Sequence, residues 1–382
     1  MKIEQQLWTK KEGWTCQQML PVGLSPQLVF AFGATATFEG NLLQEVRERY
    51  PLAYICGCST AGEIAEGQVL DDSLATTAVV FEHSEIRTSE TNVQGPDDSF
   101  VAGQTLASAL PAKGLVHAFV LSDGLKVNGT ELVRGLTSKL PAGVGLTGGL
   151  SGDGSRFGHT LVYSGGSASE GRIMALGFYG DRLRIGYGSM GGWDSFGPER
   201  KVTKSRGNVL YELDDRSALA LYKEYLGEHA AGLPASGLLF PISLRGDDGH
   251  PGVVRTILAV NEKDQSMTFA GDVPEGKYVR LMRANFDRLV DGASGAAKNS
   301  THIASQSQTT SADLAILISC VGRKLVLAQR IEEEVEAVRD VLGAAAAMTG
   351  FYSYGEISPF SATAKCELHN QTMTITTFTE AA

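Results

Sequence analysis

One order of structural elements recurs three times along this chain, and the recurrence limits the folds that it can adopt. In residues 39–50 the apolar side chains fall on one face of a helix that Pro51 ends, and a short strand that breaks into glycines follows. Residues 129–154 repeat this order, and a third copy begins at residue 331. A helix, a short strand and a glycine turn that recur in this way predict internal duplication.

Two of the three copies align without a gap at their glycine turns. The segment GCSTAGEI (57–64) aligns with GFYSYGEI (350–357), and four of the eight positions are identical. The identical residues are Gly57 with Gly350, and Gly62, Glu63 and Ile64 with Gly355, Glu356 and Ile357. So short a match can arise by chance, so it supports duplication without requiring it.

The segments between the copies have the features of strands, because they are apolar, rich in β-branched residues and bounded by tight turns. Many are neighbours in sequence, which implies antiparallel pairs beside the helix-linked strands and therefore mixed sheets. We expect an α/β (α+β) fold of two related lobes, residues 1–213 and 214–382, with mixed sheets covered by helices. The lobes are not expected to fold apart.

Two further helices are expected in the second lobe. One covers residues 214–229, after a polar stretch that marks the boundary between the lobes. The other covers residues 275–298, because apolar side chains recur at helical spacing after Pro274, namely at Tyr278, Leu281, Met282, Phe286 and Leu289.

Composition limits the classes of partner. Hydrophobic residues make up 43% and charged residues 20% of the 382 positions, which is typical of a folded soluble protein. The net charge is -10 and the basic residues are scattered, so we do not expect a nucleic-acid partner. The N-terminus lacks the apolar run of a signal peptide, and no segment reaches about 18 consecutive apolar residues. We therefore expect a cytoplasmic protein that does not bind a membrane.

The five cysteines are sparse for the length of the chain and are expected to be reduced. Cys58, Ser59 and Thr60 follow one another at a glycine-bounded strand end, where a nucleophile could be presented to a cleft. The surrounding residues do not form a nucleophile motif. A small-residue turn whose hydroxyl groups cap the backbone is the favoured interpretation, and catalysis by Cys58 is the alternative.

Two other residues are candidates for a binding site. The seven histidines show no metal-binding spacing, but a haem b ligand leaves no such signature. His369 is the strongest histidine candidate, because it lies at the entry to an alternating strand. Arg323 follows a very apolar strand and either meets a carboxylate or phosphate at the sheet edge or faces solvent.

Taken together, six segments resemble the FIST sensory domain family, with its N-terminal and C-terminal halves. They are GCSTAGEI, LSDGLKVNGTEL, GGLSGDG, SCVGRK, GFYSYGEISP and LHNQTM, and they occur in the order and separation of that family from about residue 25 onward. The resemblance implies a ligand-sensing module of signal transduction, of a kind found fused to kinases and chemoreceptors.

A narrower resemblance is to the bacterial NosP group of that family. It is based on the chain length, on the lack of an attached output domain and on the segment FAGDVPEGKYVRLMRANFDRLVDGA. It implies a haem b cofactor, nitric oxide as the ligand and a partner histidine kinase in a two-component system. His369 is then the expected iron ligand, and the sequence leaves open whether two copies form a homodimer.

The family resemblance also implies where a ligand is bound. The ligand-binding candidates are Tyr352, Tyr354, Gly355, Glu356 and Asn370 in the C-terminal segments, with Arg323, Ser59 and Thr60. Aromatic walls, polar orienting groups and glycines suit a small ligand. Two alternatives to the haem sensor remain: a haem-free sensor of a small metabolite such as an amino acid, whose carboxylate Arg323 would pair with, and a Cys58-dependent enzyme.

Overall fold

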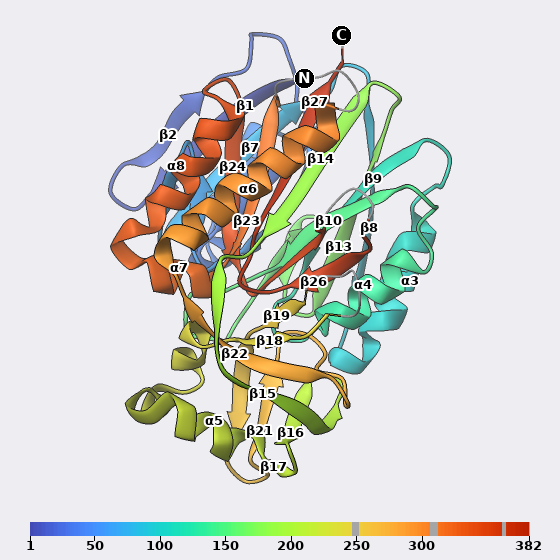
Figure 1. Ribbon diagram of the computed structural model, residues 1–382. Coiled ribbons are helices and arrows are strands. Elements are labelled where there is room, and N and C mark those ends of the chain that lie inside the picture. Colours follow the sequence, from blue (N-terminus) through green and yellow to red (C-terminus); the bar gives the residue numbers. More distant parts are fainter. Residues whose placement is uncertain (247–251, 306–311, 361–363, 382) are drawn as a thin grey trace.

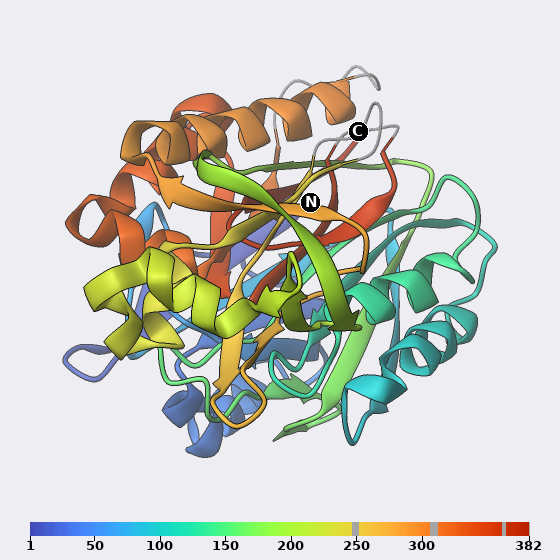
Figure 2. The ribbon, with the colours of Figure 1, turned by 60° about the horizontal axis from the view of Figure 1, so that its bottom comes forward.

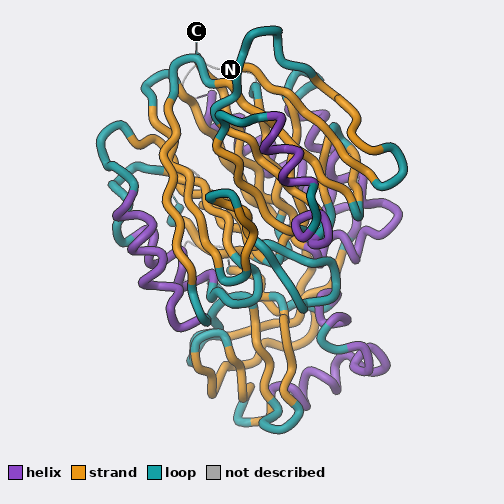
Figure 3. The backbone as a smooth tube through the Cα atoms, turned by 180° about the vertical axis from the view of Figure 1, so that it is seen from behind, coloured by secondary structure: helices purple, strands orange, loops and turns teal. Residues whose placement is uncertain are grey.

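The computed structural model describes residues 1–246, 252–305, 312–360 and 364–381. It consists of a large body and a smaller part, residues 193–284, which lies below the body in Figure 1 and comes forward in Figure 2. Three mixed sheets build the body, and helices lie on its outside (Figure 3).

The strand order of each body sheet follows from the backbone pairing. The first sheet runs in the order β12 (Ser167–Ser169), β11 (Val162–Ser164), β4 (Tyr54–Ser59), β3 (Leu28–Gly33), β7 (Ser73–Val80), β1 (Lys2–Thr9), β2 (Gly13–Gln18). The second runs in the order β26 (Cys366–His369), β25 (Gly355–Pro359), β10 (Gly145–Leu150), β9 (Leu115–Ser122), β13 (Arg172–Tyr179), β8 (Glu85–Asn92). The third runs in the order β14 (Leu183–Met190), β27 (Met373–Glu380), β23 (Leu314–Cys320), β24 (Ala347–Ser353), β5 (Glu63–Ala65), β6 (Gln68–Leu70).

The same strand triplet lies at the centre of every body sheet. In each, one strand pairs in parallel with the next long strand and antiparallel with a third: β3 with β4 and β7, β9 with β10 and β13, and β23 with β24 and β27. We call these repeats copy 1 (residues 2–80), copy 2 (85–179) and copy 3 (183–190 with 286–380). The predicted α/β class with mixed sheets and internal duplication is confirmed.

The copies exchange hairpins in a ring. The β5–β6 hairpin of copy 1 pairs with β24 of copy 3, the β11–β12 hairpin of copy 2 pairs with β4 of copy 1, and the β25–β26 hairpin of copy 3 pairs with β10 of copy 2. Every body sheet therefore contains strands from two copies. The second and third sheets also join strands from both sides of residues 213 and 214, where we expect the two lobes to meet.

Backbone hydrogen bonds close this ring where the central strands end. Each copy donates one amide to a carbonyl of the next: Ala61 N to Tyr352 O (2.8 Å), Gly152 N to Ser59 O (2.9 Å) and Tyr354 N to Leu150 O (3.2 Å). The glycine turns that drew attention in the sequence therefore lie together at the junction of the copies.

One aromatic core joins all three copies inside the body. Phe30 of β3 packs edge-on against Phe119 of β9 at 5.7 Å between ring centroids, and Phe32 of β3 packs against Phe351 of β24 at 4.8 Å. All four rings are buried. Because aromatic rings bury large apolar areas, this cluster stabilises the three copies as one unit.

Helices cover the outer faces of the sheets. Most of these helices are amphipathic, as the recurring pattern predicts. They are α1 (Thr35–Glu39), α2 (Leu42–Arg49), α3 (Ser99–Ala109), α4 (Gly129–Thr137), α6 (Phe286–Ser305), α7 (Val321–Leu327) and α8 (Ile331–Leu342), with short 3₁₀ helices η1 (Pro96–Asp98) and η4 (Ala328–Arg330).

The small part is an insertion in copy 3, between β14 and α6. Its strands lie in the order β19 (Val253–Arg255), β18 (Ile242–Leu244), β22 (Tyr278–Ala284), β15 (Trp193–Arg206), β16 (Val209–Leu213), β21 (Ser266–Phe269), β20 (Ile257–Asn261), with β17 (Arg216–Ser217) beside β16. The other elements of the insertion are α5 (Ala218–Leu226), η2 (Gly227–Gly232) and η3 (Ala235–Leu239).

The helix expected over residues 275–298 is only half correct. Its first part is the strand β22, and the helix α6 begins at Phe286. Along β22, Val279 and Leu281 are buried while Tyr278 is exposed, which is the alternation of a strand. Pairing with β15 and β18 on either side overrides the helical spacing of the apolar residues.

Candidate functional site

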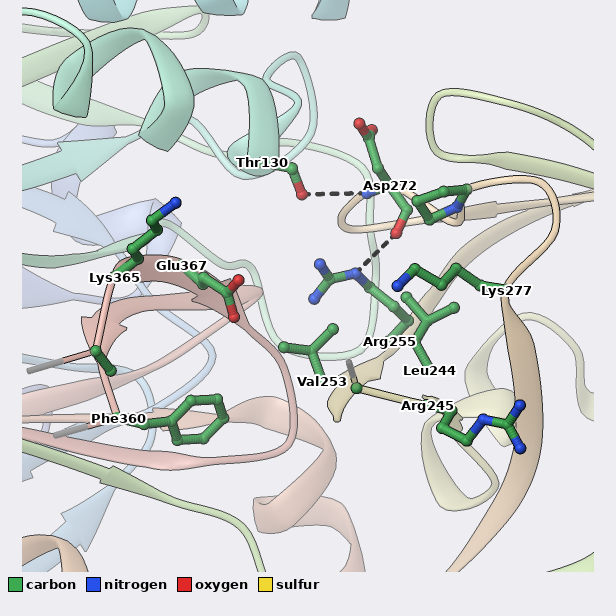
Figure 4. A pocket seen from close by; sticks show the side chains of 13 residues that line it. Thr130, Leu244, Arg245, Val253, Arg255, Asp272, Lys277, Phe360, Lys365 and Glu367 are labelled. Atoms are coloured by element: carbon green, nitrogen blue, oxygen red, sulfur yellow. Dashed lines mark hydrogen bonds between the residues drawn. The ribbon is translucent and has the colours of Figure 1, made fainter. Parts of the chain in front are cut away.

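A cleft lies between the body and the insertion. One hollow of this cleft has a volume of about 480 Å³, within the range of small-molecule sites. Four segments that are far apart in sequence line it, and Figure 4 shows them converging on the hollow. Their lining residues include Thr130 of α4, Leu244 and Arg245 at the end of β18, Val253 and Arg255 of β19, Asp272, Pro274 and Lys277 before β22, and Phe360, Lys365 and Glu367 near β26.

A second hollow, of about 610 Å³, continues the cleft between α4 and β26. The two hollows share four lining residues, namely Thr130, Arg255, Lys365 and Glu367. The second adds the apolar side chains of Val133 and Leu368. The cleft therefore has a charged region at the insertion and a more apolar extension along α4.

Arg255 joins the insertion to the body at the base of the cleft. Its side chain is 5% exposed, and Nε donates to Asp272 O (3.1 Å) while Nη1 donates to Leu368 O (2.9 Å). Within the described ranges, no carboxylate lies at ion-pair distance from it and Nη2 makes no hydrogen bond. Burial lowers the pKa of Arg255 to about 10, against the opposing charges of Asp272 and Glu367, so the group stays cationic at neutral pH.

The opposite wall of the cleft is held by the start of α4. The side-chain oxygen of Asn128 caps this helix by accepting from the amides of Thr130 and Glu131, and its Nδ2 donates to Asp272 Oδ1 at 2.7 Å. The amide of Asp272 donates to Thr130 Oγ1 at 3.1 Å. The segment that precedes β22 is thereby fixed against the body.

Gly271 allows the two walls to approach each other. A Cβ atom at this position would lie 2.7 Å from Thr130 Oγ1 and 3.1 Å from Arg255 Nε. No side chain larger than hydrogen fits without displacing one of these groups. Thr130 and Arg255 therefore flank the same glycine, one on the body and one on the insertion.

The residues that the sequence singles out as a binding site lie elsewhere, in the interior of the body. Tyr352, Tyr354, Glu356 and Asn370 are each at most 1% exposed. The hydroxyl of Tyr352 donates to Glu334 at 2.7 Å, the hydroxyl of Tyr354 donates to the carboxylate of Asp153, and Nδ2 of Asn370 donates to Tyr354 O at 3.1 Å. Their polar groups are satisfied within the chain.

Arg323 is also engaged within the chain. Its Nε and Nη2 donate to Glu334 Oε2 at 2.9 and 2.7 Å, and both side chains are fully buried. Nη2 also donates to Leu289 O at 2.7 Å. The expectation that Arg323 pairs with a ligand carboxylate is therefore not supported, because Glu334 already occupies that role.

Each of the two aligned glycine turns contains a buried glutamate whose carboxyl group accepts hydrogen bonds in the same way. Glu63 accepts from Thr60 Oγ1 and from the amide and hydroxyl of Ser73. Glu356 accepts from Ser353 Oγ and from the amide and hydroxyl of Thr372.

The other members of the two turns also have structural roles. Ser59 Oγ accepts from Leu161 N at 2.8 Å. A Cβ on Gly355 would lie 3.0 Å from Leu368. Ser59, Thr60, Gly355 and Glu356 therefore connect strands, and they do not border the cleft.

Family models match the chain in two adjoining segments. The FIST N domain matches residues 27–216 and the FIST C domain matches residues 218–359. The chain belongs to the FIST family. Five of the six segments quoted from the sequence lie within these matches, and LHNQTM (368–373) lies beyond them. FIST domains are sensory domains of signal transduction.

Other comparisons add little to the description of this FIST protein. No match was found among curated proteins. A crystal structure of cyanuric acid hydrolase from A. caulinodans is 12% identical, covers 78% of this chain and the whole of that one, and has a TM-score of 0.19, which is too low to carry an argument. No helix among the described residues is both long and apolar enough to cross a bilayer.

His369 of this FIST protein has one nitrogen that suits an axial haem ligand. Nε2 lies 2.6 Å from Ser358 O and donates to it, while Nδ1 is buried and has no partner among the described residues. Burial lowers the pKa of the ring to about 4. However, His369 borders neither hollow of the cleft, and its ring meets Phe360, which does, at 4.1 Å between centroids. This arrangement does not fit a haem bound to His369.

Cys58 is buried in β4, and burial raises the pKa of its thiol well above the usual value. A protonated, enclosed thiol is a poor nucleophile. The alternative of a Cys58-dependent enzyme therefore has no support in the geometry.

The residues that form the cleft are not among the binding-site candidates predicted from the sequence. Thr130 stands in the quoted segment LSDGLKVNGTEL and Gly271 in FAGDVPEGKYVRLMRANFDRLVDGA, but only as marks of resemblance. Arg255, Lys365 and Glu367 carry no local signal. A polar residue just after the helix cap and a glycine after a strand are the two hints that the sequence offers.

Proposed function

We propose that this FIST protein senses a small molecule that binds in the cleft between the body and the insertion. The observation that carries the proposal is that both sides line one hollow, with Arg255 of the insertion donating to Leu368 O of the body at its base. A ligand that touches both sides stabilises one relative arrangement of the two. This difference in affinity between arrangements is what a sensor requires.

A matched pair of variants tests this proposal. Val253→Trp fills the cleft, whereas Val101→Trp adds the same side chain at an exposed position of α3, where the valine is 62% exposed. Melting temperatures of the three proteins are measured against a panel of metabolites, since a bound ligand stabilises by mass action. We expect one class of compounds to raise the melting temperature of the wild type and of Val101→Trp only. If no compound does so, or if Val253→Trp responds equally, the cleft is not the sensory site.

A haem-free sensor of a small metabolite, such as an amino acid, is the form of the proposal that the cleft favours. Its lining carries both signs of charge, with Arg255 and Lys365 on the cationic side and Asp272 and Glu367 on the anionic side. Apolar side chains stand beside them, so a ligand with polar and apolar ends has partners on both.

The haem b cofactor, nitric oxide and a partner histidine kinase remain predictions. Nδ1 of His369, which has no partner among the described residues, favours haem, whereas the position of the ring outside both hollows counts against it. The absorption spectrum of the reduced protein reconstituted with haem, recorded before and after addition of nitric oxide, tests the cofactor and the gas ligand. A stoichiometric Soret band that His369→Ala removes would establish the prediction, and a band that survives would assign the iron to another residue. The absence of a Soret band would reject the haem prediction, and the metabolite sensor would be the remaining proposal.

A further inference from the structure

We propose that the cleft selects ligands that carry an oxyanion, a carboxylate or a phosphate group, and that Arg255 is the residue that determines this specificity. The inference rests on the proposed sensory function and adds the chemical class of its ligand. The oxyanion would bind at the Nη2 edge of Arg255, on the side that faces the hollow.

The two buried arginines of this chain differ in one respect. Arg323, fully buried, has the carboxylate of Glu334 at 2.7 Å, whereas the hydrogen-bond partners of Arg255, 5% exposed, are backbone carbonyls alone among the residues that the structure describes. Buried charges in proteins are normally paired, because an unpaired charge loses its hydration without compensation. Arg255 is the one that lines the cleft, so a ligand anion would provide the missing partner.

Neighbouring groups support binding of an oxyanion at this point. Thr130 Oγ1 accepts from Asp272 N, which leaves its own proton available for a ligand oxygen. Lys365 adds a cation to the wall, since it lines both hollows and is exposed. In Figure 4 the guanidinium of Arg255 points into the hollow, while the side chain of Asp272 extends away from it.

Glu367 opposes the binding of an anion in the cleft. It lines both hollows, is exposed, and its negative charge acts on Arg255 without reaching ion-pair distance. A carboxylate in this position repels an incoming anion. Removal of its charge should therefore strengthen anion binding, whereas removal of the Arg255 charge should weaken it.

Titration calorimetry measures whether removal of the Glu367 charge strengthens anion binding and removal of the Arg255 charge weakens it. Inorganic phosphate and succinate are the anionic probes, and succinamide is the neutral probe. We expect Glu367→Gln to bind the preferred anion about two- to fivefold more tightly than the wild type, and Arg255→Gln to bind about tenfold or more weakly. Lys365→Gln, an exposed change that leaves the fold intact, should weaken binding in the same direction as Arg255→Gln. Arg87→Gln, at an exposed arginine of β8, is the matched control and should leave the affinity unchanged.

The two anionic probes distinguish a carboxylate ligand from a phosphate ligand. Binding of succinate alone identifies a carboxylate ligand, and binding of phosphate alone identifies a phosphate ligand. The inference is overturned if neither anion binds at concentrations up to about 10 mM, if succinamide binds as well as succinate, or if Glu367→Gln and Lys365→Gln shift the affinity in the same direction. If neutral metabolites bind and Val253→Trp abolishes that binding, the sensory cleft stands and only its oxyanion specificity is rejected.

Discussion

At the scale of single residues, two buried glutamates in two of the copies accept the same set of hydrogen bonds. Glu63 and Glu356 occupy aligned positions, and each accepts from a hydroxyl three residues earlier and from the amide and hydroxyl of a residue at the start of a neighbouring strand. Burial raises the pKa of Glu63 to about 7 and that of Glu356 to about 8, from a usual value of 4.5. Both carboxyl groups therefore keep their protons to a higher pH in the folded chain than in the unfolded one.

This preference predicts a loss of stability with rising pH. The stabilising effect of the protonated Glu356 is complete below pH 4.5 and is lost as the pH rises to about 8, because the unfolded chain releases this proton first. The slope is about 1.4 kcal/mol per pH unit for each such group. Urea unfolding at pH 5.5 and 8.5 checks this.

The matched variants are Glu356→Gln, which cannot ionise, and Glu48→Gln, an exposed change on α2. We expect the decline between the two pH values to shrink by an amount on the order of 3 kcal/mol in Glu356→Gln only. A decline as steep as that of the wild type would show that Glu356 ionises freely in the folded chain.

The residue scale is also where sequence reasoning succeeds least. Tyr352, Arg323 and His369 stand out in the sequence because they are large polar groups among apolar ones, but that context is equally produced by buried networks. Arg255 stands in a segment without any distinctive pattern, and its importance depends on which carboxylates fold near it. The hydrogen bond from Arg255 to Leu368 O spans 113 residues and is fixed by tertiary structure alone.

At the scale of elements, the close pairing of two parallel strands explains the glycines. A Cβ on Gly57 would lie 1.8 Å from Ala31 O, one on Gly350 would lie 1.9 Å from Leu317 O, and one on Gly148 would lie 2.0 Å from Val120 O. These glycines occupy the strands β4, β24 and β10, the same place in each copy. The identity of Gly57 and Gly350 in the short alignment thus has a steric cause.

Substitution of one of these glycines should be severe. In Gly57→Ala the added methyl group overlaps backbone atoms that cannot rotate away, so we expect a loss of several kcal/mol, on the order of 4 or more. Gly95→Ala is the control, since nothing lies within 4 Å of a Cβ there and the backbone is extended. Denaturant midpoints and soluble yield measure both. Equal stability of the two variants would mean that the paired strands can separate at little cost.

The sequence predicts the order of the helices and strands better than it predicts which strands pair with each other. Helix, short strand and glycine turn were recognisable in all three copies because they depend on local periodicity. The hairpin exchange was not, because strands of three residues such as β5 and β11 carry too little pattern to indicate which distant strand they join. The helix expected across β22 was wrong for a different reason: apolar residues at helical spacing were overridden by pairing with β15 and β18.

At the scale of the whole molecule, no copy completes its own sheet. Residues 1–213 contain β10 without the β25–β26 hairpin and the β5–β6 hairpin without β24. We expect residues 1–213 and 214–382 to be insoluble or unfolded when produced separately, because each exposes unpaired strand edges and the aromatic core is divided between them, with Phe351 separated from the other three rings.

Circular dichroism and hydrogen exchange of the separate fragments, compared with the full chain, measure this. Mixing of the fragments serves as the positive control. A cooperative unfolding transition in either fragment alone would show that the exchanged hairpins are dispensable.

The ring of exchanged hairpins has the arrangement of a domain-swapped trimer built from one chain instead of three. Such a trimer would offer three identical clefts, one at each junction. The insertion follows β14 and so interrupts copy 3 alone, which places residues 193–284 over one junction and leaves the others without an equivalent wall. If the proposed function holds, the three-copy body therefore has one ligand site, at the junction that the insertion covers.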